Sequence, residues 1–161
     1  MTKQYNHARL SIDSGHEGRG IITVFLRTQS KITEITEFIR NLKELLNDRS
    51  FEAEKDFILI RSNKKADIRH STSYTIMDLG YDVNDIIEKL KELQVEEYSE
   101  TKIDKNDVNP LTLYVFGKII DNKLIYIKLK IRETERKQVV CVSFHYAERD
   151  MEFPYKQWFR R

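Results

Sequence analysis

The stretch IYIKLKI, residues 125 to 131, alternates between apolar and polar side chains along its whole length. Isoleucine and leucine occupy one parity, and Tyr126, Lys128 and Lys130 occupy the other. A period of two is typical of a β-strand that buries one face and leaves the other in solvent. The uncovered face of this strand therefore carries a phenol and two ammonium groups.

Similar patterns predict strands at about 111 to 120, 123 to 132 and 138 to 147. Asp121 and Asn122 suit a tight hairpin turn, which pairs Ile120 with Lys123 and places Gly117 opposite Tyr126. The missing side chain at Gly117 is expected to leave room beside the tyrosine ring.

The next hairpin loop, TERK at residues 134 to 137, allows two registers. We expect the one that keeps Val140, Val142 and Phe144 on the apolar face, because a slip of one residue would turn that set outward. Three pairs across the strands follow: Tyr126 with His145, Lys128 with Ser143, and Lys130 with Cys141.

Helices are predicted upstream of this meander. Apolar residues recur at helical spacing from Ile32 to Leu46, with Ser30 as the expected N-cap and an end near Asn47. Residues 56 to 61, DFILIR, predict a short buried strand.

Two short helices are expected next: one capped by Ser73 and ended by Gly80, the other capped by Asp82 and Asp85. Residues 95 to 110 are polar and predict a connection. The fold class is α+β, with helices covering one face of an antiparallel meander.

Residues 30 to 161 are predicted to form a single domain, and residues 1 to 29 a poorly ordered N-terminal extension with a short strand at 20 to 27. No apolar run approaches the roughly 20 residues that span a bilayer, and the amino terminus lacks a secretory signal pattern. We therefore expect a cytoplasmic protein with no membrane partner. The single cysteine excludes an internal disulfide and the four scattered histidines do not suggest a zinc site, so we expect no metal or cofactor. The net charge of +2 does not by itself indicate a nucleic-acid partner.

The predicted uncovered face suits an anionic phosphodiester, because its lysines offset phosphate charge and His145 exchanges protons near neutral pH. An ordinary solvated sheet face would show the same residue types, so that interpretation stays open. Cys141 is interpreted as a packing residue, Ser143 lacks an orienting acid for a hydrolase triad, and His70 is interpreted as a loop residue beside a helix.

Three segments carry a resemblance to a known family: residues 73 to 102, 113 to 131 and 139 to 155, with the phrases FGK, YIKL, SFH and FPY. They resemble the MqsR family of toxins from type II toxin-antitoxin systems, in particular a Gram-positive branch. The likeness covers about residues 56 to 155 and is strongest from Ser71 onward. It implies a RelE-like fold and a metal-independent, ribosome-independent endoribonuclease, that is, an mRNA interferase.

The resemblance also implies site positions. The family's tyrosine and lysine of the middle strand match Tyr126 and Lys128, whereas its basic residue after the Ser-Phe pair, a lysine in the best-known members, is His145 here. Two other family positions differ: a lysine in the link before the sheet is Ser99, and a glutamine in the first meander strand is Leu113.

The leading hypothesis is thus a toxin that cleaves single-stranded mRNA and is neutralised by a cognate antitoxin protein. His145, Tyr126 and Lys128 are the expected catalytic residues. Five further residues are expected to contact RNA: Lys130, Ser143, Lys118, Tyr98 and Lys102. A non-catalytic RNA- or protein-binding module is the alternative, and a regulator that kept the fold without the activity is a third.

Overall fold

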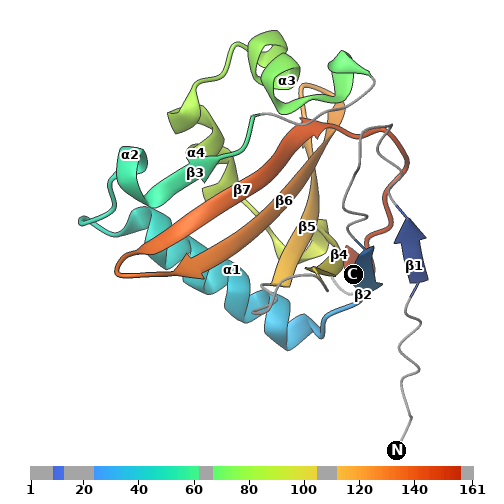
Figure 1. Ribbon diagram of the computed structural model, residues 1–161, viewed down its shortest axis with the longest axis horizontal. Helices are drawn as coiled ribbons and strands as arrows, with labels where there is room; N and C mark the ends of the chain where they lie inside the picture. Colours follow the sequence, from blue (N-terminus) through green and yellow to red (C-terminus); the bar gives the residue numbers. More distant parts are fainter. Residues whose placement is uncertain (1–8, 13–23, 62–66, 105–111, 157–161) are drawn as a thin grey trace, which may run out of the picture.

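The computed structural model describes residues 9–12, 24–61, 67–104 and 112–156. These residues include seven strands of one sheet, in the order β1-β2-β4-β5-β6-β7-β3 (Figure 1). The strands are β1 Arg9–Ile12, β2 Val24–Thr28, β3 Phe57–Leu59, β4 Tyr98–Asp104, β5 Thr112–Ile120, β6 Lys123–Glu133 and β7 Lys137–Tyr146. Neighbours are antiparallel except β3, which pairs with β7 in parallel. The predicted three-stranded meander is confirmed.

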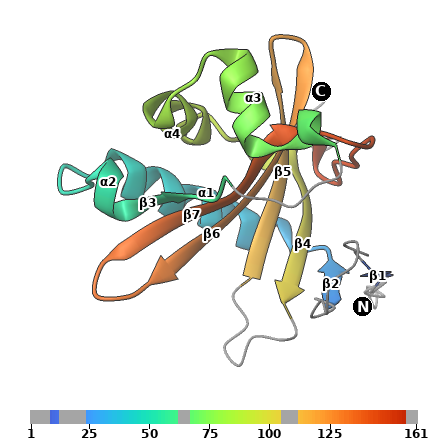
Figure 2. The same cartoon turned by 45° about the horizontal axis from the view of Figure 1, so that its top comes forward.

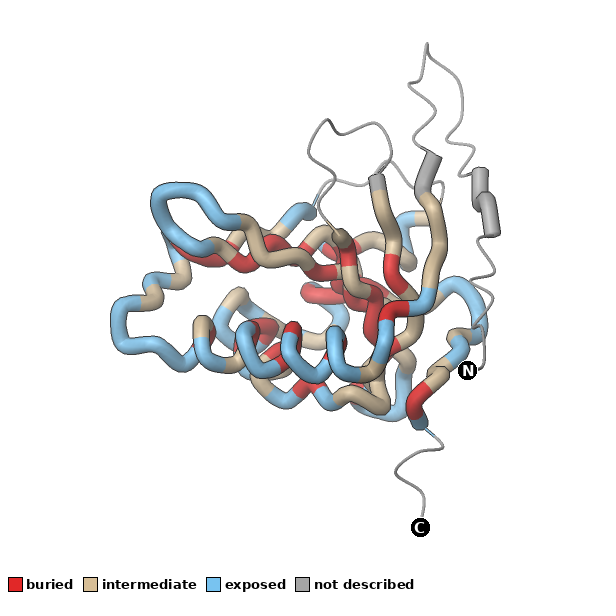
Figure 3. Tube along the Cα trace, turned by 90° about the horizontal axis from the view of Figure 1, so that it is seen from below, coloured by how far each residue is buried: buried red, intermediate tan, exposed pale blue. Residues whose placement is uncertain are grey.

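Helices cover one side of this sheet, as Figure 2 shows. They are α1 Ile32–Asn47, α2 Ala53–Asp56, α3 Thr72–Leu79 and α4 Val83–Lys91, with short 3-10 turns η1 Ile68–His70 and η2 Val95–Glu97. Buried and exposed positions alternate along α1 (Figure 3), and its buried residues join the core beneath the meander. The α+β class is confirmed. In the part of the chain described, no helix is both long and apolar enough to cross a bilayer.

The core consists of aliphatic and aromatic side chains from the helices and from the covered face of the strands. Its fully buried members include Ile35, Leu42, Ile86, Leu90, Phe116, Ile125, Ile127, Leu129 and Phe144. Burial of each such side chain contributes on the order of 1.5 to 3 kcal/mol. This apolar layer sets which parity of each strand faces away from the helices.

The helix ends differ in part from the sequence prediction. Gly80 ends α3 in the left-handed conformation, φ 67°, and Asp82 and Asp85 form the expected capping box of α4. Ser71, rather than Ser73, caps α3 by accepting a hydrogen bond from the backbone N–H of Tyr74 at 3.1 Å. Two serines lie within one turn of each other, so spacing alone did not distinguish them.

Ser30 is not the N-cap of α1, which begins after Lys31 with no side-chain cap bond. The Ser30 backbone N–H instead donates to the Tyr98 hydroxyl at 2.9 Å, and the Ser30 hydroxyl lies 2.7 Å from that of Thr101. The Tyr155 hydroxyl donates to the Ser30 carbonyl, and its ring stacks on that of Tyr98. This buried network joins the start of α1, β4 and the C-terminal segment.

Strand β4 lies in a region predicted to be a connection, and β1 and β2 lie within the predicted extension. The prediction missed β4 because its buried side consists of Tyr98 and Thr101, which satisfy their hydroxyl groups internally, rather than of aliphatic residues. Strand β2 pairs with β4 from Phe25 to Thr28, which is consistent with the short strand expected at residues 20 to 27. Residues 13–23 lie outside the described part.

A β-bulge in β7 decides how this strand meets β6. Tyr126 pairs with His145 and Lys128 with Ser143, as predicted, but Leu129 pairs with Cys141, so Val142 is an extra residue. The predicted pair of Lys130 with Cys141 is therefore wrong: Lys130 faces Val140. Cys141 joins the core, while Val140, expected there, lies outside the core cluster.

Deletion of Val142 is expected to leave the protein folded. Without the extra residue, Cys141 and Ser143 would follow each other in regular alternation and every existing pair with β6 would persist. Strand β5 pairs with β6 without irregularity, so deletion of Val115 should shift the following residues to the opposite face. Exposure of a side chain of the size of Phe116 should lower the free energy of unfolding by roughly 3 kcal/mol or more. Urea unfolding measures both variants; equal destabilisation would contradict the bulge assignment.

An ion pair ties the β6–β7 loop to α2. The Arg136 guanidinium donates to both carboxylate oxygens of Asp56, at 2.7 and 2.8 Å, and the Glu52 backbone N–H donates to the same carboxylate at 2.8 Å. Asp56 is only 3% exposed. Chiefly because of the hydrogen bonds from Arg136, the pKa of Asp56 falls to about 2.

Acid should weaken the contribution of the Asp56–Arg136 ion pair to the stability of the fold. The folded-state pKa lies below the ordinary 3.8, so the stabilisation is complete above about pH 4 and is lost as the pH falls through 2. Asp56→Asn is therefore expected to lower the melting temperature at pH 6, and this gap should shrink toward pH 2. Thermal unfolding across that range measures it, and a gap independent of pH would contradict the assignment.

Candidate functional site

The uncovered face of the meander carries a stacked pair of rings. Tyr126 and His145 are cross-strand partners, and their ring centroids lie 5.1 Å apart with planes at 17°. Both side chains lie on the face opposite the core cluster, as predicted. Tyr126 is half-buried and His145 is only 4% exposed. The stack is therefore a largely desolvated element at one end of the sheet face.

A backbone carbonyl orients the His145 ring. Its Nδ1 lies 2.9 Å from the carbonyl oxygen of Tyr146. Because a carbonyl only accepts, Nδ1 carries the hydrogen and donates it. In the neutral imidazole this places the lone pair on Nε2, the nitrogen that would accept a proton from a substrate.

Cations extend from the stack across neighbouring strands. The Lys102 ammonium lies 5.7 Å from the centroid of the Tyr126 ring and 3.8 Å from a carboxylate oxygen of Glu100. Arg27 is the cross-strand partner of Lys102, and its Nε lies 3.6 Å from Glu100. Lys128 is half-buried between Val115 and Ser143. Cations thus line the face beside the stack, and Glu100 lies between two of them, Arg27 and Lys102.

Two of the expected RNA contacts, Tyr98 and Lys118, do not lie on this face, and a third, Ser143, lies on it but is buried. Tyr98 is fully buried in the core, where burial raises its pKa, so it does not reach the face. Lys118 lies on the helix-covered parity and pairs with Glu97 at 3.3 Å. Ser143 does lie on the face beside Lys128, but it is 6% exposed. We therefore withdraw Tyr98 and Lys118 as RNA contacts.

Lys130 and Lys102 are the two remaining residues of the predicted set, and Cys141 was predicted to be a packing residue. Lys130 is half-buried on the uncovered face, opposite Val140, and Lys102 lies beside Tyr126 as described. Cys141 is buried in the core, and burial raises its pKa to about 12, so a thiolate nucleophile is disfavoured there. Leu113, at the family's glutamine position, pairs with Lys102 and is 6% exposed.

The C-terminal segment fills the space at Gly117. The predicted pair of Gly117 with Tyr126 is confirmed, but the expected room is occupied. A Cβ placed on Gly117 would lie 2.7 Å from the Phe153 ring and 3.0 Å from the sulfur of Met151. Glycine at position 117 thus allows the Phe153 ring to pack directly against the backbone of β5. Phe153 forms one wall of the site.

Gly117→Ala is expected to displace Phe153 and to lower the melting temperature, because the ring edge packs closer than a methyl group allows. Phe153→Ala in the same chain should recover part of that loss by removing the clash. Thermal unfolding of both single variants and the double variant gives the coupling energy. Strictly additive effects would contradict the packing described.

The sequence predicted His70 as a loop residue beside a helix and gave no sign of its contact with β7. Its Nδ1 lies 3.1 Å from the same Tyr146 carbonyl oxygen that His145 contacts. No spacing rule could have found it, because 75 residues separate the histidines and the contact depends on how η1 meets β7. Lys102 was predicted as an RNA contact, but its cross-strand partner Arg27 was missed, since β2 and β4 were not both predicted.

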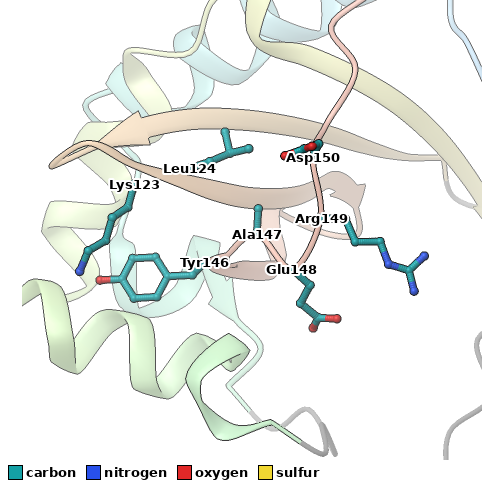
Figure 4. A pocket seen from close by; sticks show the side chains of 7 residues that line it. All are labelled: Lys123, Leu124, Tyr146, Ala147, Glu148, Arg149 and Asp150. Atoms are coloured by element: carbon teal, nitrogen blue, oxygen red, sulfur yellow. The ribbon is translucent and has the colours of Figure 1, made fainter.

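A shallow hollow of about 390 Å³ lies at the end of β6 and β7 (Figure 4). It is lined by Lys123, Leu124, Tyr146, Ala147, Glu148, Arg149 and Asp150. The Lys123 ammonium and the Tyr146 hydroxyl meet there, and both bind the Asp78 carboxylate, at 3.2 and 2.5 Å. These groups fasten α3 to the sheet, so we assign them a structural role.

Within the described ranges, His, Cys, Asp and Glu side chains do not gather in a group of three suited to a metal ion. No family model, curated protein or solved structure matches this chain.

Proposed function

We propose that the chain is an endoribonuclease that cleaves single-stranded RNA without a metal ion, acting as the toxin of a toxin-antitoxin pair. One observation carries the proposal. An imidazole whose Nδ1 is held by a backbone carbonyl stacks on a tyrosine, on a sheet face that also carries several cations. This arrangement supplies a proton acceptor beside groups that bind phosphate.

The proposed reaction is transfer of the phosphodiester within the RNA. His145 Nε2 accepts the proton of the 2′-hydroxyl, whose oxygen then attacks the adjacent phosphorus. The bond from phosphorus to the 5′-oxygen breaks, which gives a 2′,3′-cyclic phosphate and a 5′-hydroxyl. Lys128 and Lys102 offset the charge of the crowded phosphorane. The Tyr126 ring holds the imidazole plane in position by stacking.

Burial of His145 fits such a role if the substrate approaches over the neighbouring lysines. The half-buried groups beside it, Tyr126 and Lys128, offer that route, whereas Phe153 closes the side next to Gly117. Charge interactions act more strongly in a poorly hydrated site than in water. A desolvated imidazole beside fixed cations is therefore suited to a negatively charged transition state.

The resemblance to MqsR-like toxins supports the same assignment and extends it. It adds a RelE-like fold, mRNA as the substrate in the cytoplasm, and a cognate antitoxin protein that blocks the site or contacts the sheet edge. The replacement of the family's lysine by His145 changes the chemistry in favour of proton transfer, because lysine mainly supplies charge.

A binding module without catalysis is the second candidate. Stacked rings flanked by cations also bind single-stranded nucleic acid, since bases stack on aromatic side chains and lysines contact phosphates. The 4% exposure of His145 favours this alternative, because a buried imidazole has limited access to a reacting hydroxyl. Cleavage products distinguish the two functions.

Incubation of the purified protein with a single-stranded RNA in EDTA is expected to give fragments ending in 2′,3′-cyclic phosphate. His145→Ala should slow cleavage by about 100-fold or more, the usual contribution of a general base, and Lys128→Gln should slow it as well. Mass spectrometry of the fragments and gel rates measure both effects.

Lys91→Gln is the matched control, because Lys91 lies on α4, on the helix side, and pairs with Glu88 at 2.8 Å. Its rate should equal that of the wild-type protein. Binding of RNA without any cleavage would overturn the nuclease proposal and support the binding module.

A further inference from the structure

Side chains of η1 and α3 take the place of a strand along the outer edge of β7. The backbone N–H groups of Phe144 and Tyr146 donate to the hydroxyls of Thr72 and Thr75, at 3.2 and 3.1 Å. The Tyr146 carbonyl lies 3.1 Å from His70 Nδ1. Strand β3 pairs only with residues 139 to 141, so these side chains satisfy the edge beyond it.

This edge brings two imidazoles to one oxygen atom. The Tyr146 carbonyl accepts from His70 Nδ1 at 3.1 Å and from His145 Nδ1 at 2.9 Å. A carbonyl oxygen has two lone pairs, so it accepts both bonds at once. Both rings are thereby held with hydrogen on Nδ1, so any proton exchange with a substrate takes place at the two Nε2 atoms.

The surroundings of the two rings differ. His70 has 29% of its side chain exposed, and its Nε2 lies 3.8 Å from a carboxylate oxygen of Asp67. Two hydrogen bonds from the Arg69 guanidinium, each 3.2 Å long, keep Asp67 ionised by lowering its pKa. The 3.8 Å separation exceeds a hydrogen bond, so Asp67 lies near His70 Nε2 without being hydrogen-bonded to it. His145, by contrast, is buried against Tyr126.

We infer that His70 is the second proton-transfer residue of the nuclease site and that it donates a proton to the departing 5′-oxygen. The inference rests on the proposed function. His145 Nε2 takes the proton of the 2′-hydroxyl as the new bond to phosphorus forms. The bond to the 5′-oxygen breaks, and that oxygen leaves as a hydroxyl with the proton of His70 Nε2. His145 then carries one proton more and His70 one fewer, and exchange with water restores both.

A structural role alone does not account for the choice of residue. The Tyr146 carbonyl already accepts from His145 Nδ1, and an asparagine amide at position 70 would also supply its second donor. Only histidine adds a second nitrogen that transfers protons near neutral pH. The exposure of His70 also gives the leaving strand a way out, whereas the Tyr126 ring lies against His145.

The test compares two leaving groups in one RNA. The linkage cleaved by the wild-type protein is first mapped, and the same RNA is then made with sulfur in place of its bridging 5′-oxygen. A thiolate leaves without a proton, so this substrate does not need the acid. His70→Asn is the variant, because its amide keeps a donor for the Tyr146 carbonyl.

His70→Asn is expected to slow cleavage of the natural RNA by about 100-fold or more and to cleave the sulfur-linked RNA within a few-fold of the wild-type rate. His145→Ala should slow cleavage of both substrates. His70→Gln serves as a second variant, and near-ultraviolet circular dichroism checks that each chain is folded.

Equal slowing of both substrates by the folded His70 variants would assign His70 a positioning or structural role and overturn the inference. Unchanged rates on both would overturn it as well, while the nuclease proposal would stand. A wild-type protein that cleaves neither RNA would instead overturn the proposed function, and with it the role of His70.

Discussion

The extra residue in β7 is the constraint on which the site depends. Beyond the hairpin loop, Glu133 pairs with Lys137, and an uninterrupted register would bring Tyr126 opposite Phe144. That pairing would point Phe144 away from the helices and lose the burial of a large aromatic side chain. The bulge at Val142 absorbs one residue, so the strand keeps apolar side chains on the core side before and after it. His145 reaches Tyr126 as a consequence.

The outer edge of β7 imposes a second requirement, because backbone groups buried beneath a helix need partners. Two threonine hydroxyls of α3 and the His70 imidazole provide them. The same bonds fasten α3 to the sheet and cover the core at that end. His70 thus lies beside His145 because it satisfies a backbone group at the edge of β7. Any proton transfer by the pair depends on the same hydrogen bond to the Tyr146 carbonyl.

Much of the sheet could be predicted because one face of each meander strand is strongly apolar. The turn at Asp121 and Asn122, both with positive φ, and the pairing of Tyr126 with His145 follow from that alternation. The pair of Lys130 with Cys141 failed because residues 139 to 142 are apolar at every position, so parity cannot locate a bulge. His70 was beyond prediction, since no local pattern encodes a contact across a strand edge.

The C-terminal segment closes one side of the site and is firmly anchored. Tyr155 is 6% exposed, stacks on Tyr98 and donates to the Ser30 carbonyl, so the chain that carries Phe153 is held at a buried point. A wall fixed in this way does not need to open for substrate, because Tyr126 and the lysines of β6 remain partly exposed on its other side. It also keeps water from the Gly117 side of the stack. In the proposed reaction, a negatively charged strand would therefore meet the cations first and the imidazole last, which is the order that charge attraction followed by proton transfer requires.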